Sequence, residues 1–177
     1  MNIIKTKLSD CIIIEPKVYC DDRGFFLETF QAERYATVGI TLPFVQDNHS
    51  RTSKGVLRGL HFQKTKPQGK LVRVVRGEVY DVAVDIRLGS PTYGRWEAVV
   101  LSEDNKKQFW VPPGFAHGFM VISDFADFEY KGTDYYDPTD EGSLLWNDPD
   151  LNIPWPIKSP FISIKDSQAP LLANIKQ

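Results

Sequence analysis

The amino-acid sequence predicts a mainly β protein, an antiparallel jelly-roll barrel with a few short helices and an extended C-terminal tail. Two observations favour this class. Short apolar runs recur along the chain with Gly, Pro, Asp or Asn between them, which is typical of a sandwich or barrel. Helical periodicity is scarce by comparison. The 177 residues contain no internal repeat, so we expect a single domain spanning residues 1–177.

The predicted strands begin in an N-terminal arm, residues 1–15, where polar and apolar residues alternate up to the apolar run at 12–14. Further strands are predicted at residues 70–76, 78–87, 96–102, 107–111, 118–122 and 127–133. The first two of these are separated by Gly77, which we interpret as a tight turn. Within 78–87, Val82, Val84 and Ile86 alternate with Asp81, Ala83 and Asp85, a pattern that predicts a half-buried strand.

The remaining segments predict little regular structure. A short helix is expected at residues 29–38, ending at Gly39, because glycine readily takes the left-handed conformation that ends many helices. Pro112 and Pro113 cannot lie in a central strand and therefore mark a loop at the rim. Prolines interrupt the C-terminal stretch at positions 149, 154, 156, 160 and 170. They predict an extended, wrapping tail with only brief helical turns.

Composition excludes several classes of partner. A net charge of −2 and a pI near 5.9 give no basic surface for nucleic acid or an anionic membrane. The N-terminus has no signal-peptide pattern, and no apolar run reaches the roughly twenty residues that span a bilayer. Cys11 and Cys20 form no recognisable disulfide framework, so we expect reduced thiols in a soluble, cytoplasmic protein.

Two stretches carry histidines on or beside predicted strands: residues 58–63, Arg-Gly-Leu-His-Phe-Gln, and residues 113–117, Pro-Gly-Phe-Ala-His. Together they resemble the two histidine motifs of the cupin fold, in which such histidines usually hold a metal. Here Gln63 stands where a second histidine would follow His61, and residues 64–68 contain no carboxylate. A catalytic metal normally takes at least three protein ligands. We therefore expect no metal, and histidines that are free for proton chemistry.

His61 is the first candidate catalytic residue. A lone histidine in a strand is more often structural, but Arg58, Lys70 and His117 accompany this one. Several titratable groups in one cavity are typical of acid–base chemistry, and neutral imidazole is a competent base near pH 7. Lys70 is either a solvated edge lysine or, beside His61, a positive charge for a developing enolate oxygen.

Binding candidates lie elsewhere in the sequence. The segment 23–28 is equally well read as a β-turn with packed aromatic residues or as part of a site. Arg23 and Arg58 offer the planar forks that bind a diphosphate well, and residues 46–48, Gln-Asp-Asn, suit contacts to hydroxyls or a base. The chain has neither a P-loop nor a Rossmann glycine motif. Tyr130 and Tyr136 are either packing residues or cavity phenols.

Linked motifs then identify a family. The chain resembles the dTDP-4-dehydrorhamnose 3,5-epimerases, deoxysugar-nucleotide epimerases with a jelly-roll cupin fold, over almost its whole length. The motifs that carry the resemblance are residues 22–26, 44–50, 55–61, 68–73, 114–119 and 146–151. It implies inversion of C3 and C5 of dTDP-4-dehydro-6-deoxy-D-glucose through an enolate, giving dTDP-4-dehydro-L-rhamnose, without a metal, nicotinamide or other cofactor.

The resemblance also assigns roles by position. It implies that His61 is the base, Asp166 the carboxylate that orients it, Tyr130 the acid, and Lys70 the residue near the C4 oxygen. It implies that Tyr136 stacks on thymine, and that the other substrate contacts are Arg23, Phe25, Glu28, Gln46, Asn48, Arg58, His117, Glu141 and Lys165. Members of this family are homodimers with exchanged N-terminal strands, which would suit the arm at residues 1–15.

Three alternatives remain open from the sequence. The first is an epimerase that acts at C3 only, because one catalytic set can serve one centre or two. The second is a metal-dependent cupin dioxygenase or decarboxylase, against which Gln63 argues. The third is a non-catalytic sugar-nucleotide-binding cupin, which would not need His61, Lys70, Tyr130 and Asp166 together.

Overall fold

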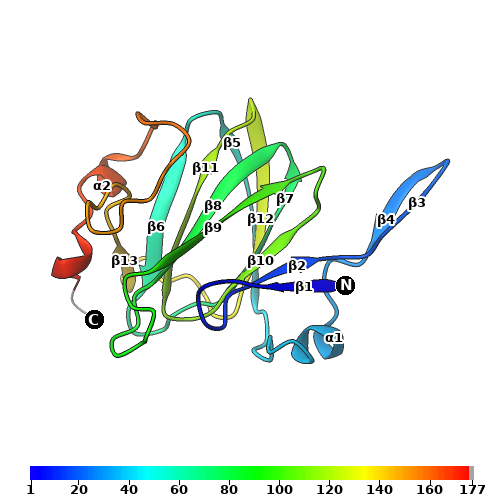
Figure 1. Cartoon of the computed structure of the whole chain (residues 1–177), viewed down its shortest axis with the longest axis horizontal. Helices are drawn as coiled ribbons and strands as arrows, with labels where there is room; N and C mark the ends of the chain where they lie inside the picture. The colour runs from blue at the N-terminus through cyan, green and yellow to red at the C-terminus, as the bar shows by residue number, and fades with distance from the viewer. Residues whose placement is uncertain (176–177) are drawn as a thin grey trace.

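A computed structural model describes residues 1–175 and shows two antiparallel β-sheets that face each other (Figure 1). In spatial order, the six-stranded sheet contains β1 (Asn2–Lys5), β2 (Ile12–Glu15), β10 (Gln108–Val111), β7 (Lys70–Arg76), β12 (Phe125–Gly132) and β5 (Gln46–Ser53). The five-stranded sheet contains β13 (Glu141–Ser143), β6 (Leu57–Gln63), β11 (Phe115–Val121), β8 (Glu78–Asp85) and β9 (Trp96–Ser102). The mainly β, antiparallel prediction is confirmed. Within residues 1–175 the strands form two facing sheets and one separate two-stranded sheet rather than one closed barrel.

The interior between the sheets contains the main hydrophobic core. Val72 and Val74 of β7 pack there with Val79 of β8 and with a stacked aromatic pair, Phe119 and Phe128, whose ring centroids are 4.1 Å apart. Burial of these apolar side chains holds the two sheets together. One part of this interior is polar instead, and it forms the cavity described below.

Strand β8 departs from the half-buried pattern that its sequence predicted. All residues from Asp81 to Ile86 are buried, and Asp81 and Asp85 have no measurable exposure. Val82 and Val84 face away from the inter-sheet core, where they pack against Leu151 and Trp155 of the C-terminal tail. Alternation on β8 therefore separates two buried environments: the tail covers the valine face, and the face with Asp81 and Ala83, which the sequence pattern left to solvent, lies against the interior between the sheets.

The C-terminal tail is extended, as its prolines predicted, with only a short helix α2 (Ile164–Ser167) and a 3₁₀ turn (Leu172–Asn174). It lies over the five-stranded sheet (Figure 1). Trp96 of β9 donates from its indole nitrogen to the carbonyl of Leu151 at 2.8 Å, which fixes the tail to the sheet edge. The tail thus supplies one hydrophobic layer of the fold and brings its own side chains to the cavity.

The N-terminal part has three pieces. Strands β1 and β2 form the predicted arm, and β2 pairs with β10 of the same chain. Next, β3 (Val18–Asp21) and β4 (Gly24–Leu27) form a hairpin that projects from the body (Figure 1). The sequence indicated the turn of this hairpin but not its strands.

The predicted helix is present as α1 (Ala32–Ala36), shorter than residues 29–38. The helix ends at Ala36, earlier than predicted, and Gly39 completes the turn that follows it with a φ of +93°. The amide of Gly39 donates to Ala36 and that of Ile40 donates to Tyr35, the two bonds of a Schellman motif. Tyr35 and Ile40 pack with Leu71 and Trp110 on the outer face of the six-stranded sheet. No helix among the described residues is long and apolar enough to cross a membrane.

Gly77 links β7 and β8, which lie in opposite sheets, so the predicted tight turn is a corner between sheets rather than a hairpin. Its φ is +77°, and a Cβ there would collide with the carbonyl oxygen of Phe125. Two more crossings between the sheets, at residues 54–56 and 122–124, lie at the same end: the amide of Lys54 donates to Asp124 and that of Glu78 donates to Ser123. These three crossings, together with a fourth at residues 103–107 where the amide of Glu103 donates to Gly77, therefore hold this end closed.

Candidate active site

A cavity of about 640 Å³ lies between the two sheets. Strands β6 and β11 form one wall, strands β5, β7 and β12 form the other, and the tail closes one side. Ten of the residues expected at the site line it: His61, Tyr130, Asp166, Lys70, Asn48, Arg58, His117, Tyr136, Glu141 and Lys165. The sequence placed these residues on motifs far apart in the chain, and the fold brings them to one place.

The two histidines are direct neighbours in the cavity wall. His61 on β6 and His117 on β11 are cross-strand partners in the antiparallel register. The register shifts just beyond them, and a Cβ at Gly59 would lie 2.6 Å from Cα of Gly118. Two glycines at this crossing allow the strands to approach closely, so the histidine side chains lie side by side.

His61 is held by a carboxylate from the tail. Its Nε2 lies 2.7 Å from Oδ1 of Asp166, which α2 presents to the cavity. The helix begins at Ser163, whose hydroxyl accepts a hydrogen bond from the Asp166 amide. Burial alone would raise the pKa of Asp166, but hydrogen bonds from His61 and the Gly59 amide hold it below its usual range. The carboxylate is therefore ionised, and it orients His61 with Nδ1 as the remaining ring nitrogen.

His117 is held by a different carboxylate, one that the sequence did not single out. Both oxygens of Asp81 on β8 lie against Nε2 of His117, at 2.9 and 3.0 Å. Both side chains are almost fully buried, and the His117 ring also stacks near Phe128. The alternating pattern of β8 gave no signal for Asp81, because it places the acid on the face opposite the valines, where a surface residue would lie.

Lys70 and Tyr130 face the histidines from the opposite sheet. Nζ of Lys70 lies 5.7 Å from the centroid of the Tyr130 ring. Burial lowers the pKa of Lys70 to about 8, against the opposing effect of Glu141 and Asp81. Burial, with Tyr136 and Glu141 nearby, raises the pKa of Tyr130 above its ordinary value. At neutral pH the cavity thus contains a protonated lysine and a protonated phenol.

Glu141, Tyr136 and Lys165 form a polar cluster at one side of the cavity. The Tyr136 hydroxyl donates to Glu141 at 3.0 Å, and Lys165 makes an ion pair with the same carboxylate. Burial would raise the pKa of Glu141, but these two partners hold it below its usual range. The other oxygen of Glu141 is 4.0 Å from Nδ1 of His61, so the cluster borders the catalytic histidine position.

Asn48 and Arg58 also line the cavity, whereas the predicted residue Gln46 does not line it and only contacts residues that do. Gln46 donates to Asn48 at 3.0 Å and accepts from the backbone amide of Tyr136, which connects β5 to the Tyr136 loop. Arg58 donates from Nε to the hydroxyl of Thr52 at 3.0 Å and remains exposed at the cavity mouth. The sequence analysis missed Phe161 and Ser163, tail residues that also line the cavity. Nothing in their local sequence marks them, because the tail reaches the cavity only through the fold.

Arg23, Phe25 and Glu28 are not brought to this cavity by the chain itself. Arg23 forms an ion pair with Asp21 within the projecting hairpin, and Phe25 lies under Nζ of Lys106 at 3.9 Å. Glu28 pairs with Arg34 of α1 at 2.6 Å. A single chain does not bring these three residues to the cavity, because the hairpin points away from the body. Their binding role stays a prediction.

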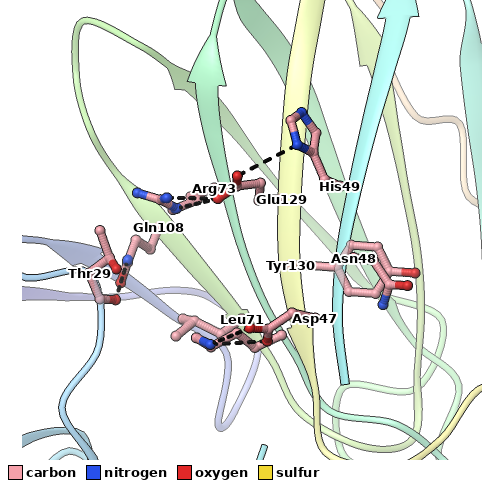
Figure 2. A pocket seen from close by; sticks show the side chains of 10 residues that line it. Thr29, Asp47, Asn48, His49, Leu71, Arg73, Gln108, Glu129 and Tyr130 are labelled. Carbon is pink, nitrogen blue, oxygen red and sulfur yellow. Dashed lines mark hydrogen bonds and ion pairs between the residues drawn. The ribbon is translucent and has the colours of Figure 1, made fainter. Parts of the chain in front are cut away.

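A second cavity, of about 340 Å³, lies beside the six-stranded sheet, and Figure 2 shows its polar lining. Arg73 and Glu129 form an ion pair at 2.7 Å, with His49 beside Glu129. Asn48 and Tyr130 border both cavities, but His61 and His117 line only the larger one. The larger cavity is therefore the candidate active site. Among residues 1–175, no three His, Cys, Asp or Glu side chains are placed to hold a metal ion together.

Comparisons with known proteins agree with this geometry. The family model described as dTDP-4-dehydrorhamnose 3,5-epimerase matches residues 5–174. The enzyme of that name from Salmonella typhimurium is 54% identical over 175 residues, covering 97% of this chain and 96% of the relative. The Escherichia coli enzyme is 53% identical over 171 residues, covering 95% of this chain and 92% of the relative.

Solved structures give the same result. The dTDP-6-deoxy-D-glucose-3,5-epimerase of Legionella pneumophila, solved in complex with dTDP-4-keto-L-rhamnose, has a TM-score of 0.96 and 59% identity, covering 99% of this chain and 94% of that one. A 3′-monoepimerase from Streptomyces bikiniensis, in complex with dTDP-quinovose, has a TM-score of 0.89 and 35% identity, covering 95% and 86%. The chain therefore belongs to the dTDP-4-dehydrorhamnose 3,5-epimerase family.

Proposed function

We propose that this chain is a dTDP-4-dehydrorhamnose 3,5-epimerase, which converts dTDP-4-dehydro-6-deoxy-D-glucose into dTDP-4-dehydro-L-rhamnose. One observation carries the proposal: a carboxylate-held histidine, His61, faces a protonated phenol, Tyr130, across one cavity from opposite sheets. Inversion of a carbon centre needs a base on one face and an acid on the other. The kinship to enzymes with this name supports the choice of substrate.

The mechanism follows from the acidity of hydrogens next to a ketone. Nδ1 of His61 removes the proton from C3, and the electrons of the C–H bond move to the C4 oxygen to form an enolate. The Lys70 ammonium stabilises that oxygen, and Asp166 stabilises the imidazolium. Tyr130 then donates its proton to the opposite face of C3. The same steps at C5 invert the second centre, and solvent returns both side chains to their starting protonation.

This chemistry as proposed needs neither a metal nor a nicotinamide, because the substrate ketone itself holds the electrons of the intermediate. Arg58 and His117 are placed to bind the diphosphate, and Tyr136, half-exposed at the mouth, is placed to stack on the base. Gln46, Asn48, Glu141 and Lys165 supply hydrogen bonds to the sugar and nucleotide. A cytoplasmic location stays a prediction.

We also propose a homodimer in which the β3–β4 hairpin of each subunit reaches the cavity of the other. Three features support it. The hairpin projects from the body, its aromatic residues Phe25 and Phe26 are 58% and 70% exposed, and it carries Arg23 away from its own cavity. Exposed aromatic residues on a projecting element are typical of an interface. Sedimentation at micromolar concentration tests the dimer, and mixing Arg23→Ala with His61→Ala subunits tests the exchange, since one restored cavity per mixed dimer is expected.

The deciding experiment is NMR of dTDP-4-dehydro-6-deoxyglucose incubated with the protein in D2O. Deuterium at both C3 and C5 supports the 3,5-epimerase. Deuterium at C3 alone would instead indicate a single-centre enzyme, such as the 3′-monoepimerase relative. Absence of enzyme-dependent exchange at either carbon would contradict the proposed chemistry and favour a binding protein.

Replacing the acid refines the assignment. Tyr130→Phe should lose inversion more than it loses deuterium exchange, because His61 can still remove a proton and return a deuteron to the same face. Equal loss of both rates would remove Tyr130 from the role of acid. The variant changes one hydroxyl in a half-buried ring, so the fold should be retained.

A further inference from the structure

Asp81 is a buried acid that contacts His117 of the cavity wall, and neither the sequence analysis nor the family resemblance assigned it to the site. It lies on β8, the strand next to β11, and it has no measurable exposure. Both of its oxygens lie against Nε2 of His117, at 2.9 and 3.0 Å. A carboxylate buried in this way requires hydrogen bonds and a nearby positive charge.

Lys70 is a second group on which the charge of Asp81 acts. It projects into the same cavity from β7, in the facing sheet. Burial disfavours its ammonium, while the charges of Glu141 and Asp81 favour it, so the pKa of Lys70 is about 8. Asp81 therefore interacts with two groups of the proposed mechanism, one on each wall of the cavity.

We propose that Asp81 is a positioning residue of this site, which orients His117 through Nε2 and supplies a buried counter-charge for the Lys70 ammonium. The part that Asp81 would play in catalysis rests on the proposed function. Its effects on His117 and Lys70, however, are properties of the ligand-free protein. With Nε2 donating to Asp81, Nδ1 is the ring nitrogen of His117 left to a bound molecule. The charge of Asp81 favours the ammonium form of Lys70, which is the form that stabilises an enolate oxygen.

The charged and titratable groups around Lys70 come from every wall of the cavity. They are Asp81 on β8, Glu141 on β13, His61 and Arg58 on β6, His117 on β11, Tyr130 on β12 and Lys165 on the tail. Only Glu141 and Asp81 act to raise the pKa of Lys70 appreciably. Glu141 also has Tyr136 and Lys165 as partners, so its replacement would disturb those contacts too. Replacement of Asp81 is therefore the cleaner way to measure how an acid changes the pKa of Lys70.

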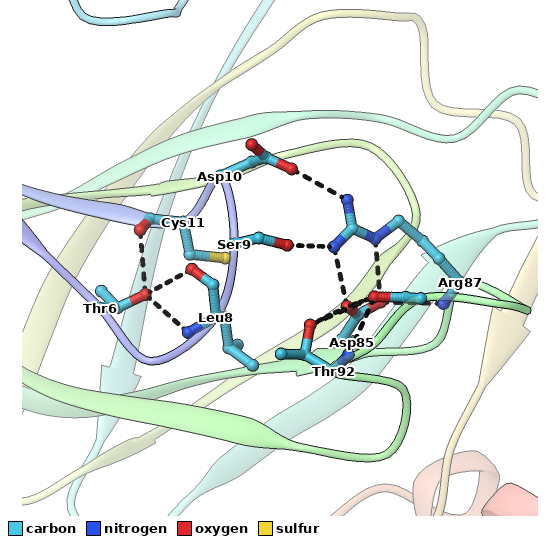
Figure 3. Close-up of polar contacts among 9 residues, drawn as sticks. Thr6, Leu8, Ser9, Asp10, Cys11, Asp85, Arg87 and Thr92 are labelled. Carbon is cyan, nitrogen blue, oxygen red and sulfur yellow. Dashed lines mark hydrogen bonds and ion pairs between the residues drawn. The ribbon is translucent and has the colours of Figure 1, made fainter.

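Asp85 is a matched control on the same strand. It too has no measurable exposure, but it belongs to a separate network (Figure 3) in which Arg87, Ser90 and Thr92 donate to its carboxylate. Arg87 also reaches Asp10 in the loop between β1 and β2. Unlike Asp81, Asp85 has side-chain partners that lie outside the cavity lining, and it does not act on the pKa of Lys70. Replacing Asp85 therefore removes a buried carboxylate from β8 without removing the one that contacts His117.

The first test is a titration of Lys70 by NMR in protein labelled with ¹³C at the lysine Cε, without any ligand. The wild-type midpoint is expected at about 8. Asp81→Asn should lower this midpoint, because the amide keeps an oxygen for the Nε2–H of His117 but carries no charge. Asp85→Asn should leave it unchanged. An unchanged midpoint in Asp81→Asn would overturn the counter-charge role, whether or not the protein is an epimerase.

The second test concerns orientation, with dTDP as the probe. Asp81→Leu removes the hydrogen bond as well as the charge, and it should weaken dTDP binding by about tenfold relative to Asp81→Asn. Equal affinities in the two variants would overturn the orienting role. Circular dichroism and thermal unfolding show whether each variant is folded. If Asp81→Leu fails to fold, Asp81→Ala with the same comparison replaces it.

A third readout separates positioning from a merely structural role. In Asp81→Asn the alkaline limb of the pH profile of kcat should move to lower pH together with the Lys70 midpoint. A destabilised but otherwise normal site would lower the amount of active enzyme without moving that limb. Asp81→Glu should restore the limb toward the wild-type position, because it restores the charge.

Discussion

The cavity contains two histidine–carboxylate pairs that are neighbours across one strand pairing but are built differently. His61 with Asp166 and His117 with Asp81 both use Nε2, at 2.7 and 2.9 Å. The His61 side chain is 30% exposed and its carboxylate comes from a four-residue helix in the tail. The His117 side chain is 6% exposed and its carboxylate comes from a central strand of the sheet.

The difference in exposure suggests that the two histidine–carboxylate contacts serve different functions. A histidine that exchanges protons with substrate and solvent needs access and a carboxylate that tolerates its change of charge. A histidine that binds and orients needs a fixed ring, which a fully buried pair between adjacent strands provides. The accessible pair is suited to proton transfer, and the buried pair is suited to positioning.

The largest expected effect comes from replacing each histidine by asparagine. His61→Asn should lower kcat by on the order of 10³-fold or more, since the base is lost. His117→Asn should act mainly on KM for the dTDP-sugar, because it loses a binding contact. Steady-state kinetics of both variants under one set of conditions makes the comparison. A larger kcat defect in His117→Asn would reverse the assignment of the two pairs.

Asp166→Asn should lower kcat by on the order of 10²-fold, because the amide neither stabilises the His61 imidazolium nor selects its tautomer. KM should change little, since His117 and Arg58 keep their own partners. The measurement is kcat and KM at several pH values. Loss of affinity with kcat intact would show that Asp166 belongs to binding rather than to proton transfer.

Lys70→Met should stabilise the fold while lowering activity, because the buried ammonium is costly. The pKa of Lys70 in the folded chain is about 8, below its ordinary 10.5, so the unfolded chain binds more protons between these values. The free energy of unfolding therefore rises with pH across that interval, and the cost is fully present below pH 8. Urea unfolding at pH 7 should show Lys70→Met more stable by about 2 to 3 kcal/mol.

That advantage should shrink at pH 9.5, where wild-type Lys70 is already neutral in the folded protein. The same comparison with Lys131→Met, a lysine outside the large cavity, controls for a general effect of removing a lysine. A wild type that is as stable as Lys70→Met at pH 7 would show that the ammonium is fully compensated by Asp81 and Glu141.

The smallest effect is expected from Ser163→Ala, which removes the cap of α2. The hydroxyl of Ser163 accepts from the Asp166 amide at 3.0 Å, and loss of such a cap costs about 1 kcal/mol. Activity should fall by tenfold or less, because Asp166 is held less firmly. The Lys70 midpoint should not change, because the cap does not touch the buried pair. A shift of that midpoint would mean that the two pairs are coupled.

Sequence reasoning found most of the strands and the residues with catalytic side chains, but not how they pair. Alternation and turn residues located β7, β9, β10 and most of β12, because these signals are local. Strand β5, with the sequence Gln-Asp-Asn-His-Ser-Arg-Thr-Ser, has no apolar alternation and was not predicted as a strand. It forms because β12 pairs with it along its whole length, which is a long-range effect.

The sequence analysis missed the His117–Asp81 pair for a related reason. Asp81 alternates with valines as a surface acid would, and only the tail, more than sixty residues later, turns the valine face into core. Asp166 came from resemblance to a family and not from spacing, since nothing local links it to His61. Arg23 and Phe25 of the hairpin are the opposite case: the sequence analysis assigned them to the site, but one chain alone does not bring them to the cavity.

The crossings at 54–56, 77, 103–107 and 122–124 have a mechanical consequence. They tie both walls of the cavity together at one end, and at Gly77 a single residue spans the gap. The sheets therefore cannot slide or part there when a ligand enters. Entry of a ligand therefore has to be accommodated by the tail and by side chains at the mouth, while a corner at which even a Cβ would collide with Phe125 holds the sheets together at that end.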